Sequence, residues 1–149
     1  MPVLGFTRFE RLFREAGGVD VDRDDVKRYL DFVNDAIYDL LITARATARA
    51  NARDIIEPHD LPVTRGLQEA VRGYQKISQD IDLDPILAEI AARPPLDISL
   101  SDDTASGLPA LFGGISVQLA RLFRLISGQH QAVHARDWDR AFAAFRLLV

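Results

Sequence analysis

Arginine side chains recur at helical spacing in two stretches of this sequence, and such rows of guanidinium groups can contact the phosphates of a nucleic acid. Arg45, Arg49 and Arg53 stand four residues apart, which places them on one face of a helix. A second group of cations lies nearer the N-terminus. The candidate phosphate-binding residues are Arg8, Arg11, Arg14, Lys27, Arg28, Arg45 and Arg49. We favour another interpretation, in which cations near a helix C-terminus stabilise the helix and the others pair with neighbouring Asp and Glu.

Two histidines offer a second candidate chemistry, metal binding. His130 and His134 stand four residues apart, with Asp137 and Asp139 close by, a spacing that helical zinc ligands use. Gly128 comes just before them and indicates a loop instead of a continuous helix, and the sequence has no HExxH motif. We therefore expect no bound metal and no cofactor.

The sequence offers little for catalysis. It contains no cysteine, which excludes thiolate nucleophiles, disulfides and cysteine metal sites. It also lacks the GxSxG and SxxK motifs of serine nucleophiles and any glycine-rich phosphate loop. The paired carboxylates Asp24-Asp25 and Asp102-Asp103 are typical of helix N-termini. We predict that the protein is not an enzyme.

Composition places the chain among ordinary folded proteins and not among DNA-packaging ones. A length of 149 residues with 48% hydrophobic and 27% charged residues fits a single domain. Its 18 basic and 22 acidic residues give a net charge of −4, the opposite of the sign that DNA packaging requires. Charged residues interrupt the N-terminal stretch, and we judge no stretch long enough to cross a bilayer. We expect a cytoplasmic protein without membrane contact, with association to the nucleoid left open.

Hydrophobic periodicity predicts helices in the order short, long, medium over the first half. A capping-box pair opens a short helix at residues 7–16, and two glycines end it. A long helix then runs, without Gly or Pro, to about Arg53. Pro58 and Pro62 fit only near a helix start, so a brief extended connector and a third helix follow. The apolar stripe of the long helix comprises Val26, Leu30, Val33, Ile37, Leu40, Leu41, Ala44 and Ala48.

The same order of elements recurs in the second half. Asp84-Pro85 begins a short helix over residues 84–91, and alternating residues 96–100 predict a short strand. A longer helix follows from about residue 109 to 127, and Gly128 ends it. The last helix carries Trp138, Phe142 and Phe145 as core residues. The two halves share an order of elements more than residue identities, which indicates a diverged structural repeat.

This order resembles the histone fold, and the region around the second loop strengthens the resemblance. Over its whole length, including residues 9–14, 55–62 and 94–97, the chain is similar to a bacterial family of single-chain histone-fold proteins of unknown function, related in fold to archaeal histones. The resemblance implies an all-α histone fold in which two tandem halves form an intramolecular pseudodimer. Residues 1–149 would then be one domain, with a first half at 1–78 and a second, diverged half at 84–149.

The resemblance also implies specific contacts. In histone folds an arginine that ends the central helix pairs with an aspartate that begins the third helix, and Arg53 and Asp60 stand at that seven-residue separation. We expect this pair to be structural. The two long helices would cross, and each first loop would form a short parallel strand pair with the second loop of the other half. Residues 96–100 would thus lie beside residues 54–56.

The glycine pair Gly113-Gly114 needs an explanation, because each glycine inside a helix costs about 1 kcal/mol. Close approach of the crossing helices would provide one. We hypothesise that these glycines meet the first long helix near Ala36.

The sequence departs from DNA-binding histones in the paired loops. Archaeal and eukaryotic histones place lysine, threonine and free backbone amides there to hold phosphates. Here the loops are acidic or apolar, at residues 19–22, Asp54-Ile55, Asp97 and Asp102-Asp103. We therefore predict a protein-interaction module that acts through histone-fold surfaces, as a monomer or low homo-oligomer with a protein partner. The alternative is a nucleoid-associated or regulatory DNA-binding protein.

Overall fold

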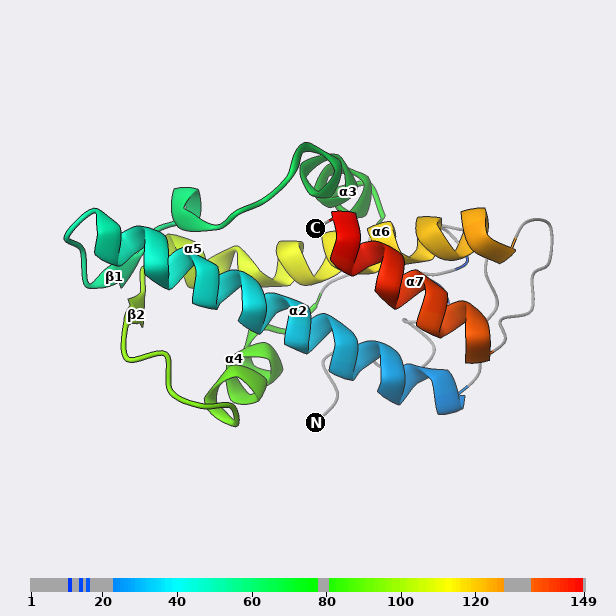
Figure 1. The fold of residues 1–149 in the computed structure, drawn as a ribbon, viewed down its shortest axis with the longest axis horizontal. Helices are drawn as coiled ribbons and strands as arrows, with labels where there is room; N and C mark the ends of the chain where they lie inside the picture. Colours follow the sequence, from blue (N-terminus) through cyan, green and yellow to red (C-terminus); the bar gives the residue numbers. More distant parts are fainter. Residues whose placement is uncertain are drawn as a thin grey trace.

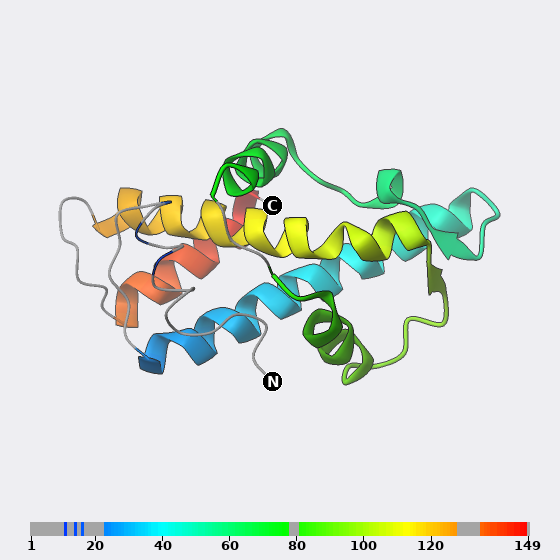
Figure 2. The same cartoon turned by 180° about the vertical axis from the view of Figure 1, so that it is seen from behind.

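The structure, a computed structural model, describes Arg11, Arg14, Ala16 and residues 23–77, 81–127 and 135–148. Its elements are α2 (Arg23–Ala50), β1 (Ile55–Ile56), the 3-10 turn η1 (Pro58–Asp60), α3 (Arg65–Gln75), α4 (Leu83–Ala91), β2 (Ser99–Leu100), α5 (Asp102–Ser106), α6 (Leu108–Ser127) and α7 (Ala135–Leu148). The long helices α2 and α6 pack against each other at an angle, α3 and α7 pack on α6, and α4 lies against α2 (Figures 1 and 2).

The core lies where the apolar stripes of these helices meet. In α2 the side chains of Ile37 and Leu41 are fully buried, as the four-residue recurrence predicts. The indole of Trp138 in α7 is also fully buried, and Phe142 stacks on Phe32 with ring centroids 4.1 Å apart. All of these residues except Phe32 come from the predicted stripes, so periodicity identified the faces that form the core.

A buried polar contact joins the two long helices inside that core. The Tyr29 hydroxyl of α2 donates a hydrogen bond to Ser116 Oγ of α6, and Ser116 donates in turn to the Phe112 carbonyl at 2.7 Å. Burial raises the pKa of Tyr29 well above its usual 10, so the phenol stays protonated and remains a donor.

The two halves are joined by the predicted strand pair. β1 and β2 are parallel, with Ile55 opposite Ser99 and Ile56 opposite Leu100. The Ser101 amide extends the pairing by donating to the Ile56 carbonyl at 3.0 Å. The strands lie at the end of the molecule where α2 ends and α5 begins (Figure 1). The expected juxtaposition of residues 96–100 and 54–56 is confirmed, whereas the companion pair expected from residues 19–22 lies outside the described residues.

Several helix boundaries differ from the prediction. α2 ends at Ala50 instead of Arg53, since Ala52 has a left-handed φ of 56° that no helix continues through. Asp60 lies in the separate turn η1, and α3 begins only at Arg65, where the Thr64 side chain accepts a hydrogen bond from the Leu67 amide at 3.2 Å. In the second half the short helix α5 precedes α6. The helix expected at residues 7–16 is described only at its three helical residues, Arg11, Arg14 and Ala16.

The expected contact of the glycine pair was wrong. A Cβ on Gly114 would meet Val71, and one on Gly113 would meet the ring of Tyr74, and both of these neighbours belong to α3. Phe112 instead faces α2, where its ring lies edge-on to Tyr29 at 6.2 Å. Adjacent positions on a helix point about 100° apart, so one stripe of α6 faces α2 and the glycines beside it face α3. The glycines therefore permit close approach of α3 to α6.

The expectation that no stretch is long enough to cross a bilayer was also wrong. Residues 108–126 in α6 have the length and mean hydropathy of a membrane-spanning helix, the one such helix in the described part of the chain. Of this stretch, 56% is buried inside the fold, between α2, α3 and α7. Its apolar character therefore belongs to the protein core.

Candidate functional site

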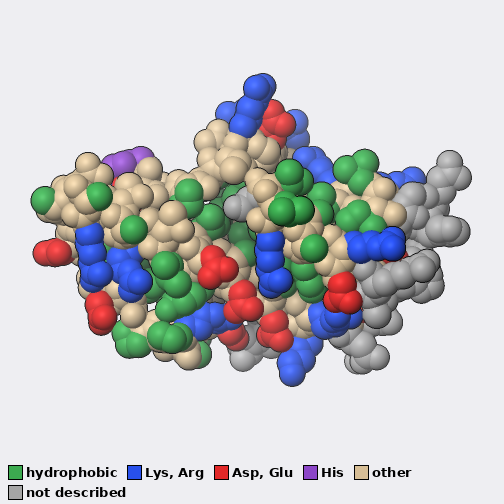
Figure 3. All heavy atoms as spheres, in the orientation of Figure 1, with side chains coloured by type: hydrophobic (Ala, Val, Ile, Leu, Met, Phe, Trp, Pro, Cys, Tyr) green, Lys and Arg blue, Asp and Glu red, His purple; other side chains and the backbone are tan. Residues whose placement is uncertain are grey.

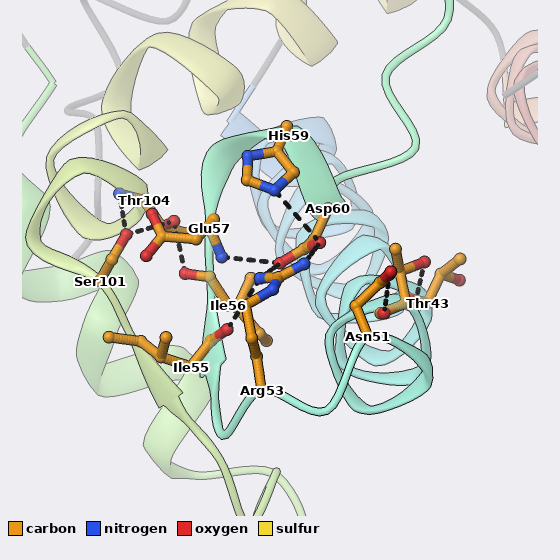
Figure 4. Close-up of polar contacts among 11 residues, drawn as sticks. Thr43, Asn51, Arg53, Ile55, Ile56, Glu57, His59, Asp60, Ser101 and Thr104 are labelled. Carbon is orange, nitrogen blue, oxygen red and sulfur yellow. Dashed lines mark hydrogen bonds and ion pairs between the residues drawn. The ribbon is translucent and has the colours of Figure 1, made fainter.

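The paired loops at the β1–β2 end bring together the residues that the sequence singled out. Arg53 donates two hydrogen bonds of 2.6 Å to the two carboxylate oxygens of Asp60, and the Glu57 amide donates a third to Asp60 at 2.9 Å. Figure 4 shows the guanidinium lying against this carboxylate, with His59 on the other side. The Asp60 side chain is fully buried and that of Arg53 is 28% exposed. The pair closes the loop that carries β1.

Those hydrogen bonds set the ionisation of Asp60. The two bonds from Arg53 lower the pKa of Asp60 from 3.8 to about 2, with a smaller contribution from the Glu57 amide, while burial acts in the opposite direction. The same contact raises the pKa of Arg53. Both groups therefore stay charged at all ordinary pH values.

We predict a specific acid sensitivity from this shift. Because the pKa of Asp60 is lower in the folded state, its contribution to stability is present above about pH 4 and is lost as the pH falls towards 2. The thermal unfolding midpoints of the wild type and of Asp60→Asn should differ most above pH 5 and converge below pH 4. Circular dichroism melts from pH 6 to pH 2 measure this, and a difference that did not vary with pH would contradict the prediction.

The rest of the arginine row also binds the paired loops. Arg45 donates to the Leu96 carbonyl and Arg49 to the Asp97 carbonyl, each at 3.0 Å. Both acceptors belong to the segment that leads into β2. The row thus fastens the C-terminal part of α2 to the second half, which supports the interpretation that these cations are structural.

Two hydroxyl groups at the N-terminal end of α5 form hydrogen bonds that stabilise β1 from the other side. The Thr104 hydroxyl donates to the Ile56 carbonyl at 2.7 Å, and Ser101 Oγ lies 2.8 Å from that hydroxyl (Figure 4). Ser101 Oγ also accepts from the Thr104 amide at 3.1 Å and so caps α5. Sequence reasoning described Asp102-Asp103 as typical of a helix N-terminus but did not predict α5 and missed Ser101 and Thr104, although serine directly before two acidic residues is a recognisable capping signal.

The other cations predicted for phosphate contact lie elsewhere. Arg28 forms an exposed ion pair with Asp139 of α7 at 2.9 Å, and Lys27 beside it is exposed. These residues are about 25 Å from Arg45 along the axis of α2. Arg11 and Arg14 are exposed residues of helical conformation, and Arg8 lies outside the described residues. The structure therefore does not gather the described members of this set into one basic surface.

The outer surface of the paired loops is acidic and apolar. Asp54, Asp97, Asp102 and Asp103 are all exposed there, and Ile55 between them is 37% exposed. Asp97 has a left-handed φ of 58°, a conformation that Asp tolerates better than most residues. These carboxylates would repel a phosphate backbone that approached the loops.

Sequence reasoning missed one ionic network. Arg93, which follows α4, donates to Asp35 of α2 at 2.7 Å and to Glu89 at 3.3 Å, and its side chain is only 19% exposed. The neighbouring Pro94 carbonyl accepts a hydrogen bond of 2.6 Å from the Tyr38 hydroxyl. The Glu89–Arg93 pair has a local four-residue spacing, but no local spacing signals the contacts with α2, because they depend on how α4 sits on that helix.

The described residues contain no group of three His, Asp or Glu side chains that could hold a metal ion. His130 and His134 lie outside the described residues. Asp137 is buried in α7, and Asp139 pairs with Arg28.

The helix order, the packed long helices and the cross-paired loops define a histone-fold protein. The fold is similar to that of the crystal structure of the histone from Methanopyrus kandleri, with a TM-score of 0.62 at 14% sequence identity over 93% of this chain and 92% of that one. Two tandem histone-fold halves thus form an intramolecular pseudodimer. The chain belongs to the family described as "Domain of unknown function (DUF1931)", which matches residues 9–146.

Bacterial relatives share this architecture. A crystal structure of a Thermus thermophilus protein is similar over 99% of both chains, with a TM-score of 0.95 and 37% identity. A 1.9 Å crystal structure of a protein from Aquifex aeolicus has a TM-score of 0.83 and 26% identity over 100% of this chain and 98% of that one. An uncharacterised protein of Aquifex aeolicus (strain VF5) is 30% identical over 127 residues, which are 85% of this chain and 74% of that protein.

Proposed function

We propose that this protein is a non-enzymatic interaction module that binds another protein through its histone-fold surfaces. The observation that carries the proposal is the use of the arginine row: Arg45, Arg49 and Arg53 all donate to groups of the protein's own paired loops. A nucleic acid would have to compete with these contacts and with the exposed carboxylates around them.

The remaining features fit the same proposal. We also propose that residues 1–78 and 84–149 are the two halves of a single domain, in which the fastened paired loops serve as a scaffold for a partner. The net charge of −4 favours basic partners over nucleic acid. We place the protein in the cytoplasm, without cofactor or metal.

The second candidate function is nucleoid-associated or regulatory DNA binding. It is favoured by the likeness in fold to an archaeal histone and by the exposed Lys27, Arg11 and Arg14. Contacts of this kind would be driven by phosphates and would weaken steeply with salt.

Fluorescence anisotropy of a labelled duplex DNA distinguishes the two functions. We expect micromolar protein to leave the anisotropy unchanged at about 50 mM and at about 200 mM salt, while a histone used as positive control binds at the lower salt. Tight binding at about 50 mM that collapses at about 200 mM would overturn the proposal. The double variant Arg45→Ala/Arg49→Ala would then show whether those side chains leave the loops to reach the DNA.

A further inference from the structure

A recess opens between α2, α7 and the loop before α3. Its floor is apolar and consists of Phe32, Ala36 and Leu40 from α2 and Phe145 from α7. Thr43 and Pro62 close one end. The cavity volume is about 190 Å³, comparable to the roughly 150 Å³ cavity that accommodates a benzene molecule. It therefore has room for one aliphatic side chain.

Two carboxylates, those of Asp35 and Asp39, line the α2 side of this recess, and Asp31 lies one helical turn before Asp35. Asp31, Asp35 and Asp39 follow one another every four residues along the exposed face of α2. Figure 3 shows acidic side chains gathered beside a hollow near the middle of this face of the molecule. Arg93 neutralises Asp35 at 2.7 Å, whereas Asp31 and Asp39 form no ion pair with the described residues. Asp39 thus offers an unpaired carboxylate at the recess and Asp31 offers one just beyond its lining, about 12 Å apart along the helix axis.

The opposite wall carries one cation. The Arg146 guanidinium lies 5.3 Å from the centroid of the Phe32 ring, in a cation–π contact. Its presence allows the sign of a ligand's charge to be tested, because a basic ligand is repelled by Arg146 and an acidic ligand is attracted.

We propose that this recess binds a basic segment of a partner protein, in which one aliphatic side chain enters the cavity and a cation on either side pairs with Asp31 and Asp39. An extended segment meets this geometry: residues i, i+2 and i+4 share one face, and i to i+4 spans about 13 Å. The sequence pattern of the partner is therefore cation–x–aliphatic–x–cation. The inference rests on the proposed function and gives that function its surface and its partner chemistry.

NMR titration of the isotope-labelled full chain tests the inference with synthetic peptides. The probe has the core Lys-Ser-Leu-Ser-Lys, and the two control peptides replace the lysines by glutamate or the leucine by serine. We expect the probe alone to cause saturable shifts of the Ala36, Leu40 and Thr43 amides. Asp31→Asn/Asp39→Asn should raise the dissociation constant about tenfold, and Arg146→Ala should lower it.

A matched double variant controls for net charge. Asp54→Asn/Asp97→Asn removes two exposed carboxylates of the paired loops, and we expect it to leave the dissociation constant unchanged. If both double variants weakened peptide binding equally, the effect would come from general electrostatics, and the inference would be overturned. The inference would also be overturned by the absence of saturable shifts at millimolar probe, or by binding of the glutamate peptide that is lost in Arg146→Ala.

Sedimentation of the free protein tests a second copy of the chain as occupant. A dimer that dissociates in Asp31→Asn/Asp39→Asn would assign the recess to self-association and overturn the inference. The proposed function fails separately, through the DNA anisotropy experiment. A chain that binds neither peptide nor DNA would remain an interaction module with its binding surface elsewhere, and the inference about the recess would be overturned.

Discussion

Replacing Arg53 by alanine is expected to lower the midpoint of thermal unfolding by roughly 10 °C. The substitution leaves the fully buried carboxylate of Asp60 without its counterion and without two hydrogen bonds of 2.6 Å. A buried charge without a partner is among the most destabilising consequences of a point mutation. Circular dichroism melts at neutral pH measure the change.

Two further variants separate the buried pair from a general loss of arginine. Arg53→Lys keeps the charge but cannot make the two-pronged contact, so its midpoint should lie between those of the wild type and Arg53→Ala. Arg65 forms an exposed pair with Glu69 at 3.5 Å, and Arg65→Ala should shift the midpoint by no more than about 1–2 °C. If Arg53→Ala melted no lower than Arg65→Ala, the pair would have no structural role.

Adding a single methyl group at Gly114 is expected to destabilise the fold by about 1–3 kcal/mol. A Cβ at this position would lie 3.1 Å from the backbone nitrogen and Cα of Val71, which belong to the facing helix α3. Backbone atoms cannot rotate away as a side chain can, so α3 and α6 would have to separate. Urea unfolding of Gly114→Ala against the wild type measures the loss.

Gly66 in α3 provides the matched control. A Cβ there would meet only the Gln118 side chain, at an ordinary 3.7 Å, and alanine is the better helix former. Gly66→Ala should therefore leave stability unchanged or raise it by up to about 1 kcal/mol. If Gly114→Ala and Gly66→Ala changed stability in the same way, helix propensity, and not the approach of α3 to α6, would determine the effect at Gly114.

Local sequence signals predicted much of the fold because they are set within a few residues. The four-residue recurrence of Val33, Ile37 and Leu41 identified the buried face of α2. Asp84-Pro85 correctly located the start of the short helix α4 to within a residue or two. The alternation of residues 96–100 indicated the strand that pairs with β1.

The same signals cannot say which neighbour covers a given face. Gly113 and Gly114 were expected to meet α2 and instead meet α3, since periodicity identifies buried positions but not the helix that buries them. The contact of Arg93 with Asp35 spans 58 residues and depends on the docking of α4.

Within the candidate site, the seven-residue spacing of Arg53 and Asp60 is local enough to be seen in the sequence, whereas the acceptors of Arg45 and Arg49 are not. Those acceptors are backbone carbonyls of the other half, at Leu96 and Asp97. Any residue type supplies a carbonyl, so no side chain signals the contact.

The acidic row beside the recess belongs to α2 alone, since α6, the corresponding long helix of the second half, contains no Asp or Glu. A histone dimer made of two identical chains would display such a row twice and could hold two partners at once. Because both halves belong to one chain, the second half can lack the acidic row while the first half keeps it. The proposed site would therefore give each chain a valency of one: it would engage a basic partner in a one-to-one complex and would not crosslink two partners through this surface.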